Sequence, residues 1–175
     1  DIVGFGTVLA PTGLIASDVN VKNYAAEAKY FAVLYDGKEV PIALALEDKS
    51  GLFFFQAALP EGYKADAVAL GNSDKLKLGQ AVLVIAPSGE LQKGIISGLV
   101  KDSTAETATS TPENQVTSVK LIKLSIALSL ENSGSPLVSL GGETVGVTFY
   151  RDGAKVSVPS NVIKEGMAAL SAAGR

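Results

Sequence analysis

Short apolar runs separated by Gly and Pro turns recur along the whole chain, and this pattern constrains its fold more than any other feature. Within residues 145–149, three apolar side chains alternate with a glycine and a threonine, which is typical of a strand with one buried face. Asp36 and Gly37 lie between two runs of β-forming residues and predict a hairpin turn. Many short strands with regular turn signals indicate an all-β sandwich or barrel.

Composition favours closed β structure and excludes several classes of function. The 175 residues are 47% hydrophobic and include 18 glycines, which argues against disorder and against a helical bundle. A net charge of −3 provides no basic surface for nucleic acid, so we expect no nucleic-acid partner. The absence of cysteine excludes disulfides and thiolate catalysis. The absence of histidine removes the commonest general base and the commonest metal ligand near neutral pH.

The turn signals divide the chain into segments. We expect one group of strands within residues 1–70, a polar connector over 71–79, and a second group of strands within 80–158. Residues 102–116 are rich in Ser, Thr, Ala and Glu and have no apolar periodicity, which predicts a mobile surface loop. Apolar residues at helical spacing predict a C-terminal helix over 159–173.

One turn carries a candidate nucleophile. Residues 131–138 read Glu-Asn-Ser-Gly-Ser-Pro-Leu-Val and place Ser133 on a tight loop between two apolar runs. Gly and Ser satisfy turn geometry by themselves, so such a loop is usually only a turn. Its flanks change this interpretation, because residues 122–138 resemble, without a gap, the nucleophile segment of the HtrA/Deg branch of trypsin-like serine proteases. In that family the loop reads Gly-Asn-Ser-Gly-Gly-Pro-Leu-Val.

The resemblance extends over nearly the whole chain and implies a fold. Residues 4–7 with 13–15, then 70–76, then 158–163 resemble further blocks of the same family in the same order. The implied fold is the chymotrypsin-like double barrel, which consists of two antiparallel six-stranded β-barrels and a C-terminal helix. Residues 1–70 and 80–158 would then be the N-terminal and C-terminal barrels of a single domain.

The resemblance places the nucleophile at Ser133 and indicates three losses around it. The family's catalytic histidine falls on Asn20, and the aspartate that orients it falls on Gly51. The glycine whose backbone N–H helps to form the oxyanion hole is replaced by Glu131. An amide cannot accept and return a proton near pH 7, and a carboxylate opposes the developing negative charge. No shift of the alignment restores the triad, because the chain contains no histidine.

We therefore expect a pseudoprotease, a catalytically inactive serine protease homologue that acts by binding or scaffolding. Loss of a single triad member typically lowers turnover by ~10⁴ to 10⁶, and here the base, the orienting residue and part of the oxyanion hole change together. Ser133 would be a turn serine inherited with the fold. The expected ligand is an extended peptide or a protein segment that adds a strand to a sheet edge, with residues 145–150 and the loop around Ser125 as candidate sites.

Two other functions stay open at this stage. Ser133 would be the nucleophile of an active serine hydrolase if a non-histidine base such as Lys123 served it. A repurposed groove would bind Ca²⁺ or Mg²⁺ through Glu47, Asp48 and Glu131, since only oxygen ligands remain without His and Cys. Solvated surface roles are the simpler interpretation of Glu47 and Asp48, so the sequence predicts no metal and no cofactor.

The resemblance also implies a setting for the parent protein. Members of the family are mostly extracytoplasmic, in the periplasm or cell envelope, are often trimeric and frequently carry a PDZ domain. By resemblance we expect an extracytoplasmic location, and a homo-oligomer or an active homologue as partner. The sequence has no apolar run long enough to span a membrane and starts at Asp1, so we expect a trimmed fragment with any membrane anchor outside it.

Overall fold

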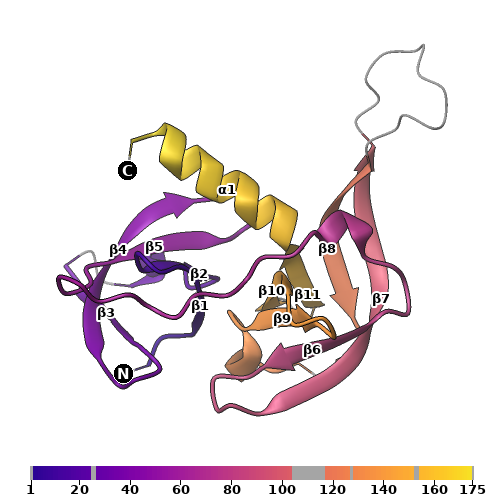
Figure 1. Ribbon diagram of the computed structural model, residues 1–175, viewed down its shortest axis with the longest axis horizontal. Coiled ribbons are helices and arrows are strands. Elements are labelled where there is room, and N and C mark those ends of the chain that lie inside the picture. The colour runs from indigo at the N-terminus through magenta and orange to yellow at the C-terminus, as the bar shows by residue number, and fades with distance from the viewer. Residues whose placement is uncertain (1, 25–26, 104–116, 127, 152–153, 175) are drawn as a thin grey trace.

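The computed structural model describes residues 2–24, 27–103, 117–126, 128–151 and 154–174. Its strands form two antiparallel units that lie side by side, with one C-terminal helix (Figure 1). Most of the predicted surface loop at 102–116 lies outside the described residues. Among the helices of the described segments, none is long and apolar enough to cross a membrane.

The first unit is a five-stranded sheet in the order β1-β2-β5-β4-β3. A short 3-10 helix, η1 (Val21–Asn23), follows β2. The strands are β1 (Gly6–Ala10), β2 (Leu14–Ser17), β3 (Tyr30–Val33), β4 (Glu39–Glu47) and β5 (Phe53–Ala57).

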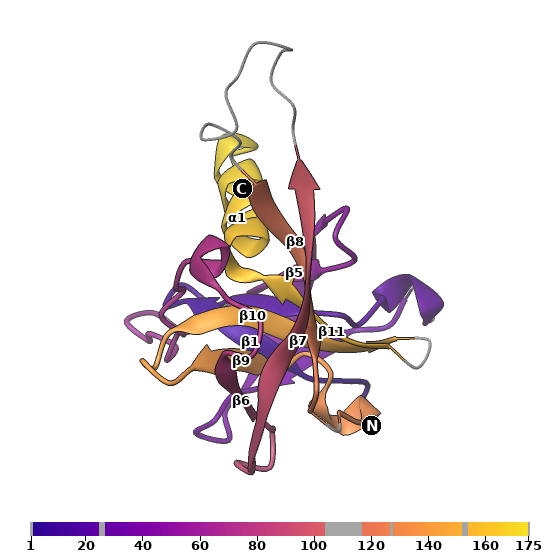
Figure 2. The ribbon, with the colours of Figure 1, turned by 90° about the vertical axis from the view of Figure 1, so that its right-hand side faces the viewer.

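The second unit is a closed six-stranded barrel in the order β10-β11-β8-β7-β6-β9. Figure 2 faces this barrel and shows the long strand β7 running beside β8. Its strands are β6 (Ala81–Ile85), β7 (Leu91–Ser103), β8 (Thr117–Leu124), β9 (Pro136–Ser139), β10 (Thr144–Arg151) and β11 (Ala154–Pro159). The prediction of a six-stranded C-terminal barrel is therefore confirmed.

The prediction of a six-stranded N-terminal barrel is wrong, because the described residues of the first unit form five strands, and this sheet does not close into a barrel. The segment 67–70 makes one backbone contact with β1, in which the Val68 N–H donates to the Val8 carbonyl at 3.0 Å. It then leaves the sheet, and Leu70 forms a parallel bridge with Thr144 of β10. The segment thus joins the two units instead of completing the first.

Three phenylalanines of β5 show how alternation builds the cores. Phe53 and Phe55 point into the cluster inside the first sheet. Phe54 points to the opposite face and joins a cluster with Val147 of β10 and Ile163 of the C-terminal helix. Successive strand residues face opposite sides, so a single apolar run serves two cores. The second of these cores lies between the two units.

The C-terminal helix α1 (Ser160–Ala172) contacts both units, within one residue of the predicted range at each end. The Ser160 hydroxyl donates to the Gly71 carbonyl at 3.0 Å, which holds the start of the helix to the connector. At Gly166 the helix approaches β5 so closely that an added Cβ would lie 2.6 Å from Cζ of Phe54. The connector also contains the 3-10 helix η2 (Ser73–Lys75).

The predicted hairpin at Asp36-Gly37 joins β3 to β4 and is tied to the loop after β5. Gly37 has a φ of 79°, as the turn requires. The Tyr63 hydroxyl donates to Oδ2 of Asp36 at 2.8 Å, and Nζ of Lys38 lies 3.9 Å from the centre of the Tyr63 ring. The Tyr63 hydrogen bond, followed by the backbone N–H of Lys38, lowers the pKa of Asp36.

Tyr63→Phe is expected to raise the pKa of Asp36 toward its ordinary value, as measured by carboxyl NMR titration. Because the folded-state pKa of Asp36 lies below the unfolded-state value, this interaction stabilises the fold above the unfolded-state pKa. Its contribution is lost as the pH falls through the folded-state pKa. Tyr24→Phe is the matched control and should leave this pKa unchanged. An unchanged pKa in Tyr63→Phe would show that the hydroxyl does not hold the carboxylate.

Candidate functional site

The loop that carries Ser133 is a short 3-10 turn followed by β9. The 3-10 helix η4 (Leu130–Asn132) ends at Ser133, whose backbone N–H donates to the Leu130 carbonyl at 3.1 Å. Oδ1 of Asn132 accepts the Ser129 N–H at 3.1 Å and the Ser129 hydroxyl at 3.0 Å, which closes the turn from its start. The loop is thus built by its own small polar residues, as the sequence pattern indicates.

Thr148 of β10 fixes this loop to the barrel. Its hydroxyl lies 2.8 Å from the Asn132 carbonyl and 2.9 Å from the Ser135 carbonyl. Its backbone N–H donates to the Ser135 carbonyl, and its backbone carbonyl accepts the Gly134 N–H, both at 2.8 Å. Thr148 is fully buried, so the prediction that β10 has one buried face is wrong at this position. The loop covers the face that alternation alone assigned to solvent.

The Ser133 side chain is directed at a carboxylate. Ser133 is 7% exposed, and its hydroxyl donates to Oδ2 of Asp18, which directly follows β2 in the first unit. Asp18 was not among the predicted site residues, although it lies two residues before Asn20 in the block that the resemblance aligns with the family's catalytic histidine. A carboxylate in that block is the signal that would have pointed to it.

Asn20, which the resemblance aligns with the family's histidine, has a local role. Its Oδ1 accepts the Lys22 backbone N–H at 3.0 Å and caps η1. Lys22 in turn forms an ion pair with Glu47 at the end of β4, both side chains being well exposed. The structure therefore brings η1 next to the end of β4, and this end of β4 lies four residues before Gly51 in the sequence. An exposed ion pair of this kind contributes little to stability.

Gly51, which the resemblance aligns with the family's aspartate, lies in the turn between β4 and β5. Its φ is 86°, and its N–H donates to the Asp48 carbonyl at 3.0 Å. The Asp48 carboxylate accepts the Ser50 N–H at 2.8 Å and so belongs to the same turn. An L-aspartate at position 51 would be strained in this conformation.

The described segments contain no group of three or more His, Cys, Asp or Glu side chains placed to hold a metal ion.

The backbone N–H of Ser133, one of the oxyanion donors of a trypsin-like site, is already hydrogen-bonded in this arrangement. A tetrahedral intermediate needs backbone N–H groups aimed at the developing oxyanion. Here the Ser133 N–H is used inside η4, and the side chain of Glu131 stands exposed on the same turn. Lys123, the alternative base, lies on β8 with an exposed side chain whose stem packs over Gly98.

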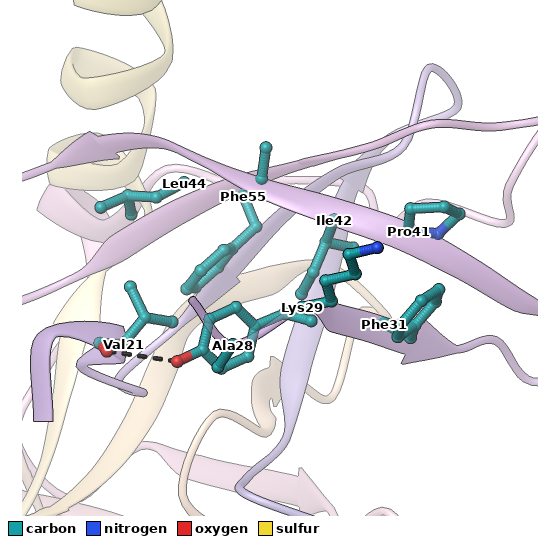
Figure 3. A pocket seen from close by; sticks show the side chains of 10 residues that line it. Val21, Ala28, Lys29, Phe31, Pro41, Ile42, Leu44 and Phe55 are labelled. Carbon is teal, nitrogen blue, oxygen red and sulfur yellow. Dashed lines mark hydrogen bonds between the residues drawn. The ribbon is translucent and has the colours of Figure 1, made fainter. Parts of the chain in front are cut away.

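A separate apolar groove lies on the first unit, as Figure 3 shows. It has a volume of about 530 Å³ and is bordered by η1, β3, β4 and β5. The Tyr30 hydroxyl donates to the Val21 carbonyl at 3.3 Å across one end of it. Among the described residues that line it, Lys29 alone is charged, so the groove offers no acid–base pair. None of its lining residues belongs to the Ser133 loop.

Comparison with known proteins finds similarity to trypsin-like serine proteases. A family model described as a trypsin-like peptidase domain matches residues 4–147. Serine protease HTRA1A of Danio rerio is 27% identical over 170 residues, covering 94% of this chain and 34% of that protein. A probable periplasmic serine endoprotease DegP-like of Pseudomonas fulva is 29% identical over 182 residues, covering 99% of this chain and 36% of that protein. The chain thus spans about a third of the length of these curated relatives.

A solved structure of similar fold is the HtrA-type protease AlgW with decapeptide. It aligns with a TM-score of 0.70 at 20% identity, and the match covers 96% of this chain and 51% of that one. At this identity the likeness concerns the fold.

Proposed function

The chain belongs to the trypsin-like peptidase family as an HtrA-type domain, and we propose that it is a catalytically inactive member that binds extended peptides or protein segments. The observation that carries the proposal is the hydrogen bond from the Ser133 hydroxyl to Asp18. In an active member an imidazole would take this proton, and none of the 175 residues is histidine.

The backbone of the Ser133 loop supports the same proposal. Catalysis of acyl transfer depends on preorganised N–H donors, and loss of one donor typically costs ~10² to 10³ in turnover. The Ser133 N–H is occupied by the Leu130 carbonyl. An incoming carbonyl would have to displace this bond before it could be polarised. Glu131 would add negative charge beside the same position.

Strand β10 supplies the proposed peptide edge. Residues 144–147 pair with β9 on one side, and Gly146 and Val147 also pair with β11 on the other, so this part of the predicted 145–150 edge is wrong. Beyond Thr148, β10 pairs with β11, and no strand of the described segments pairs with it on the β9 side. Because the backbone of Thr148 faces the Ser133 loop, alternation directs the backbone groups of Tyr150 the same way. A peptide added there would run past Ser133.

The peptide edge is tested by backbone substitution. Fluorescence anisotropy would follow a labelled pool of decapeptides cut from reduced, carboxymethylated lactalbumin. Tyr150→Pro removes one backbone N–H and is expected to weaken binding at least about 10-fold, whereas Tyr150→Ala keeps that N–H and serves as the matched control. Equal binding by the wild type and Tyr150→Pro, or no binding by the wild type, would refute the proposed edge.

An active serine hydrolase is the second candidate, and the Ser133 contact favours Asp18 over Lys123 as its base. In that case the carboxylate would take the hydroxyl proton as Oγ attacks. A fluorophosphonate probe separates the two functions. The inactive domain should stay unlabelled, whereas labelling at Ser133 that is lost in both Ser133→Ala and Asp18→Asn would establish the hydrolase.

The setting of the domain is also part of this proposal. Its relatives include proteins named as periplasmic and a Bos taurus relative named as mitochondrial, 27% identical over 164 residues. We place this domain in an extracytoplasmic compartment, where it assembles with copies of itself or with an active homologue. Light scattering of the purified chain, alone and mixed with an active relative, tests the assembly.

A further inference from the structure

Side-chain hydrogen bonds join the Ser133 loop to the first unit. One is the hydrogen bond from the Ser133 hydroxyl to Asp18, across 115 residues of sequence. Another is a buried hydrogen bond of 2.8 Å from the Thr7 hydroxyl on β1 to the Gly134 carbonyl. Both connect the first unit to the second unit, at the consecutive residues Ser133 and Gly134 of one loop.

The first unit holds its side of these contacts firmly. The Ser17 hydroxyl donates to the Phe5 carbonyl at 2.6 Å and accepts the Val19 N–H at 3.2 Å. Asp18 therefore lies between Ser17, which carries this hydroxyl and is buried, and Val19, whose N–H the hydroxyl accepts. Such bracing reduces the entropy that the Asp18 carboxylate loses when it binds a partner.

The barrel holds its own side equally firmly. The Gly134 N–H donates to Thr148 on β10, and Gly134 adopts a φ of 86°. An added Cβ at Gly134 would lie 2.2 Å from the Phe5 carbonyl oxygen. The backbones of the two units are thus in contact at this point, with no room for a side chain.

From this arrangement we infer that Asp18 is a positioning residue, which receives the Ser133 hydroxyl in place of an imidazole and fastens the Ser133 loop across the two units. The serine then acts as one half of a structural tie. The Ser133–Asp18 tie holds the loop against the first unit, in the conformation in which the Ser133 N–H donates to the Leu130 carbonyl. This role holds whether or not β10 binds a peptide.

A double-mutant cycle on the whole 175-residue chain tests the tie. Ser133→Ala and Asp18→Ala are each expected to lower Tm by about 4–8 °C, since a hydrogen bond to a charged group is lost and its partner is left half-buried. The double variant should lie within about 1 °C of the less stable single variant, because both substitutions remove the same bond. Ser171→Ala and Asp66→Ala, two exposed positions outside the loop, are the matched controls and should change Tm little.

Hydrogen exchange at the Gly134 amide gives a second measurement that general destabilisation would not reproduce. This amide donates to Thr148. In Asp18→Ala its exchange should increase at least about 10-fold, while amides of β7 and β8 stay protected. Asp18→Asn keeps an oxygen acceptor and should retain most of the protection. Additive Tm losses, or unchanged Gly134 exchange in Asp18→Ala, would overturn the inference.

Discussion

Purified wild-type protein is expected to hydrolyse an unfolded protein at least ~10⁴-fold more slowly than an active HtrA relative under the same conditions. The Ser133 hydroxyl faces Asp18, and the Ser133 N–H is bonded to Leu130. Hydrolysis thus lacks an imidazole base, and the Ser133 N–H is not available to the developing oxyanion. Peptide release from reduced, carboxymethylated lactalbumin, followed by chromatography, measures the rate.

The controls for this experiment separate residual chemistry from contamination. Ser133→Ala should show the same residual rate as the wild type. Asn20→His alone should not raise the rate, because Gly51 leaves a new imidazole without its carboxylate and the oxyanion donor stays bonded. A wild-type rate 10-fold above that of Ser133→Ala would contradict the proposed function.

Phe54→Ala is expected to lower the free energy of unfolding by ~3–5 kcal/mol, the usual cost of emptying a fully buried aromatic site. Phe54 is 0% exposed and contacts α1 at Gly166, where the helix has no side chain that could fill the space. The loss would fall on the core between the two units. Urea denaturation followed by circular dichroism measures it.

Phe31→Ala is the matched control for this substitution. Phe31 lies on the edge strand β3 and is 55% exposed, so its truncation should cost less than about 1.5 kcal/mol. Equal losses in the two variants would show that the core between the units contributes no more than the surface of the first sheet.

Strands and local turns could be predicted from the sequence because their determinants are local. Alternation over residues 145–149 located β10, and Asp36-Gly37 located the hairpin between β3 and β4. The same alternation could not show that Thr148 is buried, because the Ser133 loop covers it from elsewhere in the chain. The sequence also could not show that the first unit stays open. It stays open because the segment 67–70 divides its backbone contacts between β1 and β10.

In the candidate site, too, features set by the local sequence could be predicted and features set by distant contacts could not. Ser133 was identified from its own loop, and the structure places it at the junction of the two units. Asp18 was not identified, because its partner lies 115 residues away and no local pattern connects them. The roles of Asn20 and Gly51 in local turns depend on hydrogen bonds, one to the Asn20 side chain and one from the Gly51 backbone, that their residue types allow but do not require.

The packing of α1 on Phe54 has a consequence for synthesis of the chain. The 13 residues of the helix follow the strands of both units in the chain, yet they complete a core to which β5 contributes from far earlier in the sequence. While the ribosome still holds them, Phe54 lacks the partner that covers its ring. The nascent N-terminal sheet therefore cannot reach its final stability until the helix has been synthesised, and a product cut off before Ser160 would expose this aromatic surface to chaperones and proteases.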